Sequence, residues 1–146
     1  MQVDFYHLTR TPLARALPRI AERILANAGR LLVVASEEGM RAQLDQQLWT
    51  YAPDGFLPHG LAGGEDDARQ PVLISDGVEA ANGAENVALA DGIWRDEALG
   101  FARAFHFFTD DRIQEARLAW KSLAEKEGVE RRYWKQDEAG RWEQAA

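Results

Sequence analysis

The amino-terminal third of the chain alternates twice between a strand pattern and a helix pattern. The segment Val3–Leu8 mixes β-branched and aromatic residues, which is typical of a strand, and Thr11 follows it as a helix cap. The continuous apolar run at 30–35 is typical of a strand covered on both faces, and Ser36 caps a second helix after it. Strands and helices joined in this order by short turns indicate a parallel α/β arrangement.

Two prolines and a glycine shape the prediction for the first helix. Pro12 opens the helix without cost, because the first N–H groups of a helix have no partner inside it. Pro18 lies within the helical pattern and is predicted to kink the helix or to displace its start. Gly29 is predicted to end it.

The remainder of the chain predicts further strands and two more helices. The predicted strands lie near Phe56–Leu57, at Pro71–Ser75, at Val87–Ala90 and, as an edge strand, at Val129–Trp134. One helix is predicted from Asp96, because apolar residues recur at helical spacing as far as His106. A longer helix is predicted from Thr109 or Asp110 to about Lys126, ended by Gly128.

The charges are unevenly spread along the chain. There are 17 basic and 24 acidic residues, so the net charge is −7, which argues against broad binding of nucleic-acid phosphates. The segment 112–135 departs from this balance, with 7 basic against 4 acidic side chains, a local charge of 7 − 4 = +3. A patch of this size suits an acidic peptide or carboxylate better than a long duplex.

The composition also limits the chemistry and the compartment. The absence of cysteine excludes disulfide scaffolds, thiol catalysis and cysteine-ligated metal sites. No apolar run approaches the ~20 residues of a membrane span, and the first ten residues lack the pattern of a secretory signal. We therefore expect a cytoplasmic protein.

The sequence lacks the motifs of nucleotide binding and of common catalysis. The turn Ser36-Glu37-Glu38-Gly39 has no glycine-rich phosphate loop and puts carboxylates where an anion would bind. His59 beside the acidic run 65–67 is either a metal ligand or part of a solvated loop, and His7 and His106 are interpreted as interior or edge histidines. We expect a single α/β domain over 1–146, Rossmann-like without a nucleotide-binding loop, with no catalytic site, cofactor or metal.

The clearest candidate for binding is the carboxyl-terminal helix. Arg117, Trp120 and Lys121 stand three and four residues apart and therefore share one helix face, with cations flanking an indole ring. This set suits a peptide that ends in an aromatic residue and its α-carboxylate. The alternative is that Trp120 belongs to the core and the cations form an ordinary solvated rim.

A second candidate surface surrounds a proline-rich turn. It consists of residues on either side of Ala52-Pro53-Asp54-Gly55: Trp49, Tyr51, Phe56, Leu57 and Pro58. Such residues are frequent at protein interfaces, and they are equally frequent in cores.

The order of motifs resembles the chi subunit family of bacterial DNA polymerase III nearly from end to end. The resemblance rests on the opening Val3–Leu8, on Leu44–Trp49, on Phe56-Leu57-Pro58-His59-Gly60-Leu61-Ala62-Gly63, on Pro71–Ile74, and on Ala116-Arg117 with Trp120-Lys121. The Phe-x-Pro-His-x-Leu-Ala-Gly stretch is the most specific of these.

The resemblance implies a non-catalytic accessory subunit associated with the clamp loader. Members of the family pair with the psi subunit and bind the acidic, phenylalanine-terminated tail of single-stranded DNA-binding protein. By position, the tail site carries over to Arg117, Trp120 and Lys121, with tryptophan where tyrosine is familiar. Ile113 stands where another cation is expected, so Arg112 would substitute for it, and the resemblance leaves Arg131 and Arg132 to supplement the charge.

The resemblance also assigns the second candidate surface. Trp49 and Phe56, with Leu57 and Pro58 beside them, match the psi-facing residues, and in some bacteria a repair helicase shares this surface. DNA is then reached only indirectly, through the protein that coats it. Two other hypotheses stay open: an enzyme with a nucleotide-like ligand, and direct nucleic-acid binding by the carboxyl-terminal patch.

Overall fold

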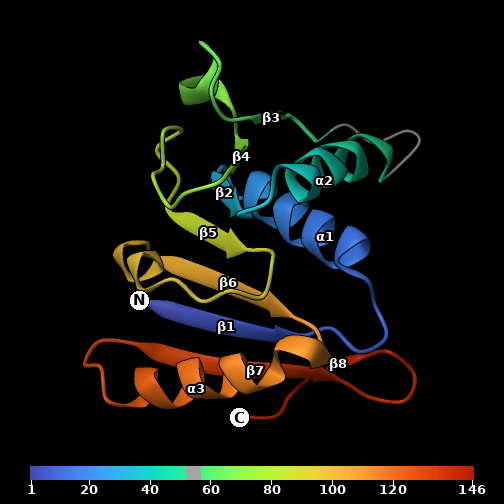
Figure 1. The fold of residues 1–146 in the computed structure, drawn as a ribbon, viewed down its shortest axis with the longest axis vertical. Helices are drawn as coiled ribbons and strands as arrows, with labels where there is room; N and C mark the ends of the chain where they lie inside the picture. The colour runs from blue at the N-terminus through green and yellow to red at the C-terminus, as the bar shows by residue number, and fades with distance from the viewer. Residues whose placement is uncertain (52–56) are drawn as a thin grey trace.

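A computed structural model describes residues 1–51 and 57–146 of the chain (Figure 1). Its centre is an eight-stranded sheet in the order β3-β4-β2-β5-β6-β1-β7-β8, in which only the β7–β8 pairing is antiparallel. The strands are β1 (Gln2–His7), β2 (Leu31–Val34), β3 (His59–Leu61), β4 (Val72–Ser75), β5 (Asn86–Leu89), β6 (Arg103–Phe108), β7 (Glu130–Gln136) and β8 (Trp142–Gln144). The helices are α1 (Leu13–Ala26), α2 (Glu38–Thr50) and α3 (Ile113–Ala124). The predicted α/β class with a mainly parallel sheet is confirmed.

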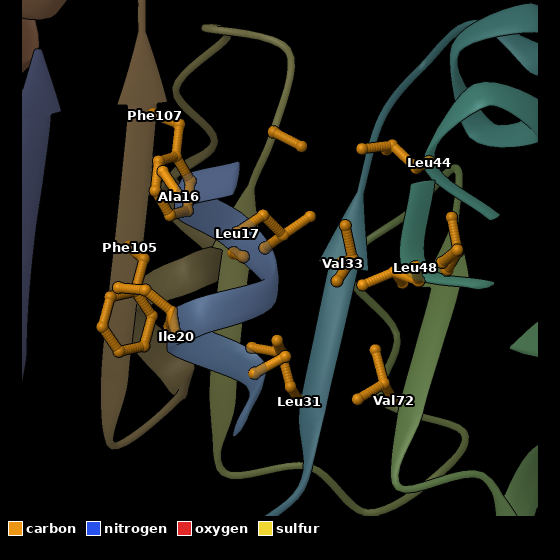
Figure 2. Packing of buried hydrophobic residues seen from close by; sticks show 14 of the residues in the cluster. Ala16, Leu17, Ile20, Leu31, Val33, Leu44, Leu48, Val72, Phe105 and Phe107 are labelled. Atoms are coloured by element: carbon orange, nitrogen blue, oxygen red, sulfur yellow. The ribbon is translucent and has the colours of Figure 1, made fainter. Parts of the chain in front are cut away.

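The sheet separates two hydrophobic clusters because successive side chains of a strand point to opposite faces. Leu31 and Val33 of β2 belong to the cluster under α1 and α2, whereas Leu32 and Val34 belong to the cluster under α3. Figure 2 shows residues of the first cluster, with α1 packed beside the phenylalanines of β6 and α2 beside β2 and β4. We call these faces the α1 face and the α3 face.

The amino-terminal elements largely follow the sequence pattern. Strands β1, β2, β4 and β5 confirm the predictions to within one or two residues at each end. Pro18 was predicted to kink the first helix or to displace its start, and the start is not displaced, because α1 begins at Leu13 and continues through the buried Pro18. The caps also differ: Pro12 and Glu37 occupy the N-cap positions, and neither Thr11 nor Ser36 provides a capping hydrogen bond.

The largest correction concerns β6. The residues predicted as a helix from Asp96 form a short 3₁₀ helix, Asp96–Gly100, followed by strand β6. Strand β6 lies between β5 and β1, and its last five residues are all buried. A short apolar run that is buried on both faces carries no periodicity, so pairing with its neighbours decides its structure.

Three smaller corrections concern the sheet edges and the last helix. The predicted edge strand 129–134 is β7, an interior strand, because β8 pairs with it and forms the edge. The strand expected near Phe56–Leu57 lies further on, at β3, and Phe56 is outside the described residues. The long helix is confirmed, although its first turn, Asp110–Arg112, is a 3₁₀ helix.

An alanine in a left-handed conformation ends α1. Ala28 has φ of 59°, its N–H donates to the Leu25 carbonyl at 3.0 Å, and the Gly29 N–H donates to the Ile24 carbonyl at 2.8 Å. This is the hydrogen-bond pattern of a Schellman cap, in which glycine is the preferred left-handed residue. The chain therefore carries local strain at Ala28, one residue before the glycine that was predicted to end the helix.

Replacing Ala28 with glycine is expected to raise the free energy of unfolding by about 0.5–1 kcal/mol. The reason is that a left-handed alanine costs roughly 1–2 kcal/mol, part of which the extra freedom of glycine in the unfolded chain offsets. Urea unfolding measures the change. Ala26→Gly, in the last helical turn, is the matched control and should lower stability by about 1 kcal/mol. A loss of stability in both variants would contradict the assignment of strain to Ala28.

None of the helices in the described residues has the length and apolar character that a membrane crossing needs.

Candidate functional site

The carboxyl-terminal helix brings the predicted basic–aromatic residues to one flank of α3. Arg117 and Lys121 are exposed, whereas Trp120 is half-buried. The indole packs edge-on against Phe5, with ring centroids 5.3 Å apart, and against Tyr133, at 5.6 Å. Trp120 therefore lies at the margin of the core. One part of the side chain packs in the core, as one interpretation of its spacing supposed, and another part is exposed and accessible to a ligand, as the other supposed.

Arg131 is the cation closest to the indole. Its guanidinium carbon lies 4.0 Å from the centroid of the Trp120 ring, and its Nη1 donates to the Trp120 carbonyl oxygen at 2.7 Å. A guanidinium over an indole face is a favourable cation–π arrangement, and the hydrogen bond fixes its position. Arg131 thus joins strand β7 to helix α3 at the candidate site.

Tyr133 is a further member of this cluster that sequence reasoning missed. It follows Arg131 by two residues on β7, so both side chains lie on the α3 face. Burial raises the pKa of Tyr133, and the positive charge of Arg117 opposes this rise. The signal available in the sequence was the alternation Arg131-x-Tyr133 within the predicted strand. We call Arg117, Trp120, Lys121, Arg131 and Tyr133 the Trp120 cluster.

The other predicted cations lie apart from this cluster. Arg112 forms an exposed ion pair with Glu115, with 2.9 Å between Nη1 and Oε1, at the start of α3. Arg132 points to the α1 face, since it alternates with Arg131, and it pairs with Glu130 at 3.0 Å. Ile113 packs against the core cluster under α3.

The second candidate surface lies at the end of α2. Trp49 is 53% exposed, and its ring meets that of His59 at 4.8 Å. Leu57 is buried in the core cluster under α1 and α2, so it anchors this segment to the core. Pro58 is partly exposed. Phe56 falls outside the described residues. Leu61 of β3, 46% exposed, is an apolar residue near this turn in the sequence that sequence reasoning missed.

His59 connects the two segments that form this surface. Its Nδ1 lies 2.7 Å from the Leu57 carbonyl oxygen, and its Nε2 lies 3.0 Å from Oδ1 of Asp45 on α2. These contacts join the loop before β3 to the helix that carries Trp49. Among the described residues, no group of three or more histidine, aspartate or glutamate side chains is placed to hold a metal ion. The contacts of His59 with Leu57 and Asp45 indicate that its ring positions the loop before β3 against α2.

Side chains of this chain pair with one another in the crevice where doubly wound folds bind nucleotides. It lies at the carboxyl ends of β2 and β5, whose connections leave in opposite directions. There the Arg95 guanidinium donates to both carboxylate oxygens of Asp91, each at 3.0 Å, and to the Ser36 hydroxyl at 2.7 Å.

Asp91 and Arg95 are largely enclosed, with side chains 10% and 13% exposed. Burial acts to raise the pKa of Asp91, but hydrogen bonds from Arg95 and from the Ser36 and Ile93 N–H groups outweigh it, so this pKa is lowered. The Asp91 carboxylate therefore places a negative charge at this end of the sheet, which disfavours binding of a phosphate beside it.

Comparison with known proteins agrees with the resemblance drawn from the motifs. Residues 1–130 match the family model described as "DNA polymerase III chi subunit, HolC". Among similar curated proteins, the probable DNA polymerase III subunit chi of Rickettsia prowazekii is 26% identical over 83 residues, covering 57% of this chain and 50% of that protein. The DNA polymerase III subunit chi of Pseudomonas aeruginosa is 33% identical over 84 residues, covering 56% of this chain and 58% of that protein. The matched regions thus span about half the length of these relatives.

Proposed function

Because the chain belongs to the DNA polymerase III chi subunit family, we propose that it is a non-catalytic accessory subunit that joins the clamp loader to DNA coated with single-stranded DNA-binding protein. The observation that carries this proposal is the Trp120 cluster, which gathers three cations and two aromatic rings on the α3 face of an otherwise acidic chain. The replication complex also supports a cytoplasmic location. In this function the coating protein, and not this subunit, contacts the DNA.

The Trp120 cluster fits the acidic, phenylalanine-terminated tail of single-stranded DNA-binding protein. Arg131 is already held over the indole, so little side-chain entropy is lost when it meets an anion. Arg117 and Lys121 are exposed and present further donors for the α-carboxylate and the acidic residues before it. Ile113 replaces a cation of the family pattern, and at this position it offers an apolar contact for the terminal ring.

Reversing the charge of Arg117 or Lys121 is expected to weaken binding of such a peptide by about 10- to 100-fold, because a hydrogen bond to a charged group contributes about 1.5–3 kcal/mol. Isothermal titration calorimetry with an acidic peptide ending in phenylalanine measures the change, and binding should weaken as salt rises. Lys126→Glu changes another exposed charge, beyond the end of α3; it is the matched control, and the variant should keep the affinity of the unaltered protein. Equal affinities for Arg117→Glu, Lys121→Glu and the unaltered protein would remove the assigned site.

The second candidate surface, around Trp49, supports a further part of the proposal, that the chain pairs with the psi subunit. Trp49 exposes apolar area, its burial by a partner would be favourable, and large aromatic residues dominate such interfaces. His59 and Leu57 hold the surface in place from the core side. Where a repair helicase is present, the same residues are the proposed contact, so the two partners would compete.

Trp49→Ala is expected to weaken the complex with the psi subunit at least tenfold, since truncation of a central aromatic residue costs about 2–4 kcal/mol. Co-purification of the two co-expressed subunits, followed by titration, measures the loss. Leu118→Ala on α3, where the leucine is 69% exposed, removes apolar area on the other face of the sheet and serves as the control. Complexes of equal affinity for the Trp49→Ala variant and the unaltered chain would place the psi interface elsewhere.

A further inference from the structure

A second basic–aromatic surface lies on the α1 face, where the sheet extends past α1. On this part of the face, Tyr6 of β1, Trp134 of β7 and Trp142 of β8 are all partly exposed. The Tyr6 and Trp134 rings are nearly parallel, with centroids 6.2 Å apart, and Trp142 meets Tyr6 edge-on at 5.2 Å. By contrast, Phe105 and Phe107 of the neighbouring strand β6 are buried in the cluster under α1. An aromatic platform therefore continues outward from the core.

Two cavities meet at Tyr6 along the flank of α1. The larger is about 360 Å³ and the smaller about 60 Å³, and Tyr6, Ile20 and Arg23 line both. Arg103, Asn27 and Asn86 add polar groups to the larger cavity, whereas Trp142 closes the smaller one. We call this pair of cavities the Tyr6 groove. The volume of the larger cavity falls within the range of about 300–1,000 Å³ that is typical of ligand sites.

The charges around the Tyr6 groove favour an anion. Arg23 and Arg103 line the larger cavity together with Tyr6. Burial and Asp4 raise the pKa of Tyr6, and the positive charges of Arg103, Arg23 and Arg132 oppose the rise. Asp4 is fully buried and its charge is balanced by Arg103, with 2.8 Å between Nε and Oδ2. Glu85 is the carboxylate that lines the groove itself.

Arg23 is the cation best placed to bind a ligand. It is exposed, and in the part of the chain that the structure describes its side chain has no hydrogen bond or ion pair. Arg103 and Arg132, by contrast, are each paired with a carboxylate. A planar guanidinium suits bidentate recognition of phosphate, and aromatic side chains suit stacking of a base.

From this juxtaposition we propose that the Tyr6 groove binds a nucleotide unit of single-stranded nucleic acid, with the base against the Tyr6 platform and the phosphate on Arg23. The net charge of −7 limits the contact to a short footprint, because a longer strand would be repelled by the rest of the surface. A duplex is disfavoured, since its bases are paired and cannot enter a groove beside a helix. This goes beyond the proposed function, in which the subunit reaches DNA only through the coating protein.

The test is a titration of the full chain into a fluorescein-labelled thymidine 12-mer at low salt, followed by anisotropy. Arg23→Glu is expected to weaken binding at least tenfold, and Arg23→Gln, which removes the charge at similar length, by a smaller factor. Arg15→Glu is the matched control, because Arg15 is exposed on the same helix and lines neither cavity, and it should change binding less than twofold. If Arg23 neutralises one phosphate, Arg23→Gln should also reduce the slope of log affinity against log salt by about 0.7.

Competition identifies the source of the nucleotide. If unlabelled thymidine monophosphate displaces the 12-mer at equal nucleotide concentration, the groove binds nucleotides and its occupant is a free nucleotide. If only an unlabelled oligonucleotide displaces the 12-mer, the occupant is a single strand. Equal weakening by Arg15→Glu and Arg23→Glu would overturn the proposal, because the attraction would then be general. An acidic peptide whose binding depends on Arg23 while the 12-mer does not bind would also overturn it.

The test separates this groove from the Trp120 cluster, since they lie on opposite faces of the sheet. Arg117→Glu should weaken peptide binding and leave binding of the 12-mer unaffected. Arg23→Glu should weaken binding of the 12-mer and leave peptide binding unaffected. If 12-mer binding is abolished by Arg117→Glu instead, the carboxyl-terminal patch binds nucleic acid directly, and the Tyr6 groove is not the site.

Discussion

Replacing Arg103 with leucine is expected to lower the free energy of unfolding by about 3 kcal/mol, because it leaves the buried carboxylate of Asp4 without its counter-charge. Asp4 has no exposed surface, and it accepts hydrogen bonds from Arg103 Nε at 2.8 Å, from Trp134 Nε1 at 3.0 Å and from Gln2 Nε2 at 3.0 Å. After the substitution, the remaining hydrogen-bond donors to the Asp4 carboxylate, Trp134 and Gln2, are neutral. The Arg103 side chain is 42% exposed, so water can approach the vacated place, and the loss should fall at the low end of the range for buried ion pairs.

A double-mutant cycle separates the ion pair from the packing of Arg103, whose guanidinium also lies over the Phe105 ring at 4.6 Å. Asp4→Asn keeps the shape and can still accept from Trp134, so the variant with both changes should be more stable than Arg103→Leu alone. Urea unfolding of the four proteins gives the coupling free energy. A coupling near zero, with Arg103→Leu losing less than about 1 kcal/mol, would show that Asp4 does not depend on this partner.

The first half of the fold could be predicted because each element carries its own signal. The apolar run that became β2 is buried on both faces, and the residues that became α1 repeat with a helical period, so local pattern and tertiary position agree. The caps could not be predicted as well. Ser36 had the right residue type for a cap, but its hydroxyl accepts from Arg95, a partner 59 residues away.

Strand β6 shows where local pattern gives the wrong answer. Leu99, Ala102 and Phe105 recur at a helical spacing, yet from Arg103 onward the chain pairs with β1 on one side and β5 on the other. Both interpretations bury the same aromatic residues. Only the order of strands in the sheet distinguishes them, and that order depends on contacts about a hundred residues apart.

The candidate sites follow the same rule. The helical spacing of Arg117, Trp120 and Lys121 was enough to place them on one flank of α3. The position of Arg131 over the indole required the parallel register between β1 and β7, which pairs Val3 with Arg131. The Tyr6 groove could not be predicted from the sequence, because its residues come from α1 and from four strands, β1, β5, β6 and β8, that are far apart along the chain.

Lowering the pH from about 7.5 to about 4.5 is expected to cost the protein roughly 2–3 kcal/mol through one side chain, His106, and His106→Leu should remove most of that loss. His106 is fully buried on β6, and in the described structure neither of its ring nitrogens has a hydrogen-bond partner. Phe5, Trp94 and Phe108 surround it, with ring centroids 5.3, 5.6 and 5.7 Å away. Protonation would place a charge among aromatic rings.

Burial lowers the pKa of His106 from 6.5 to about 4, while the nearby charges oppose each other, Asp91 raising this pKa and Arg95 lowering it. Because the folded-state pKa lies below the unfolded one, the unfolded chain binds the proton first as the pH falls. The contribution of neutral His106 to stability is therefore complete above about pH 6.5 and is lost progressively as the pH falls towards 4. A leucine has no proton to bind, so its variant should unfold with a flatter pH profile.

The measurement is the free energy of unfolding in urea at both pH values, and the informative quantity is the difference between them, since any packing cost of the new side chain cancels. Phe105→Leu, the buried neighbour on the other face of β6, is the control: it should lower stability equally at both pH values. If the His106→Leu variant loses as much stability on acidification as the unaltered protein, then the folded, unaltered protein accommodates the imidazole of His106 in its charged form. The aromatic cluster around it would then have to open to water below pH 6.5.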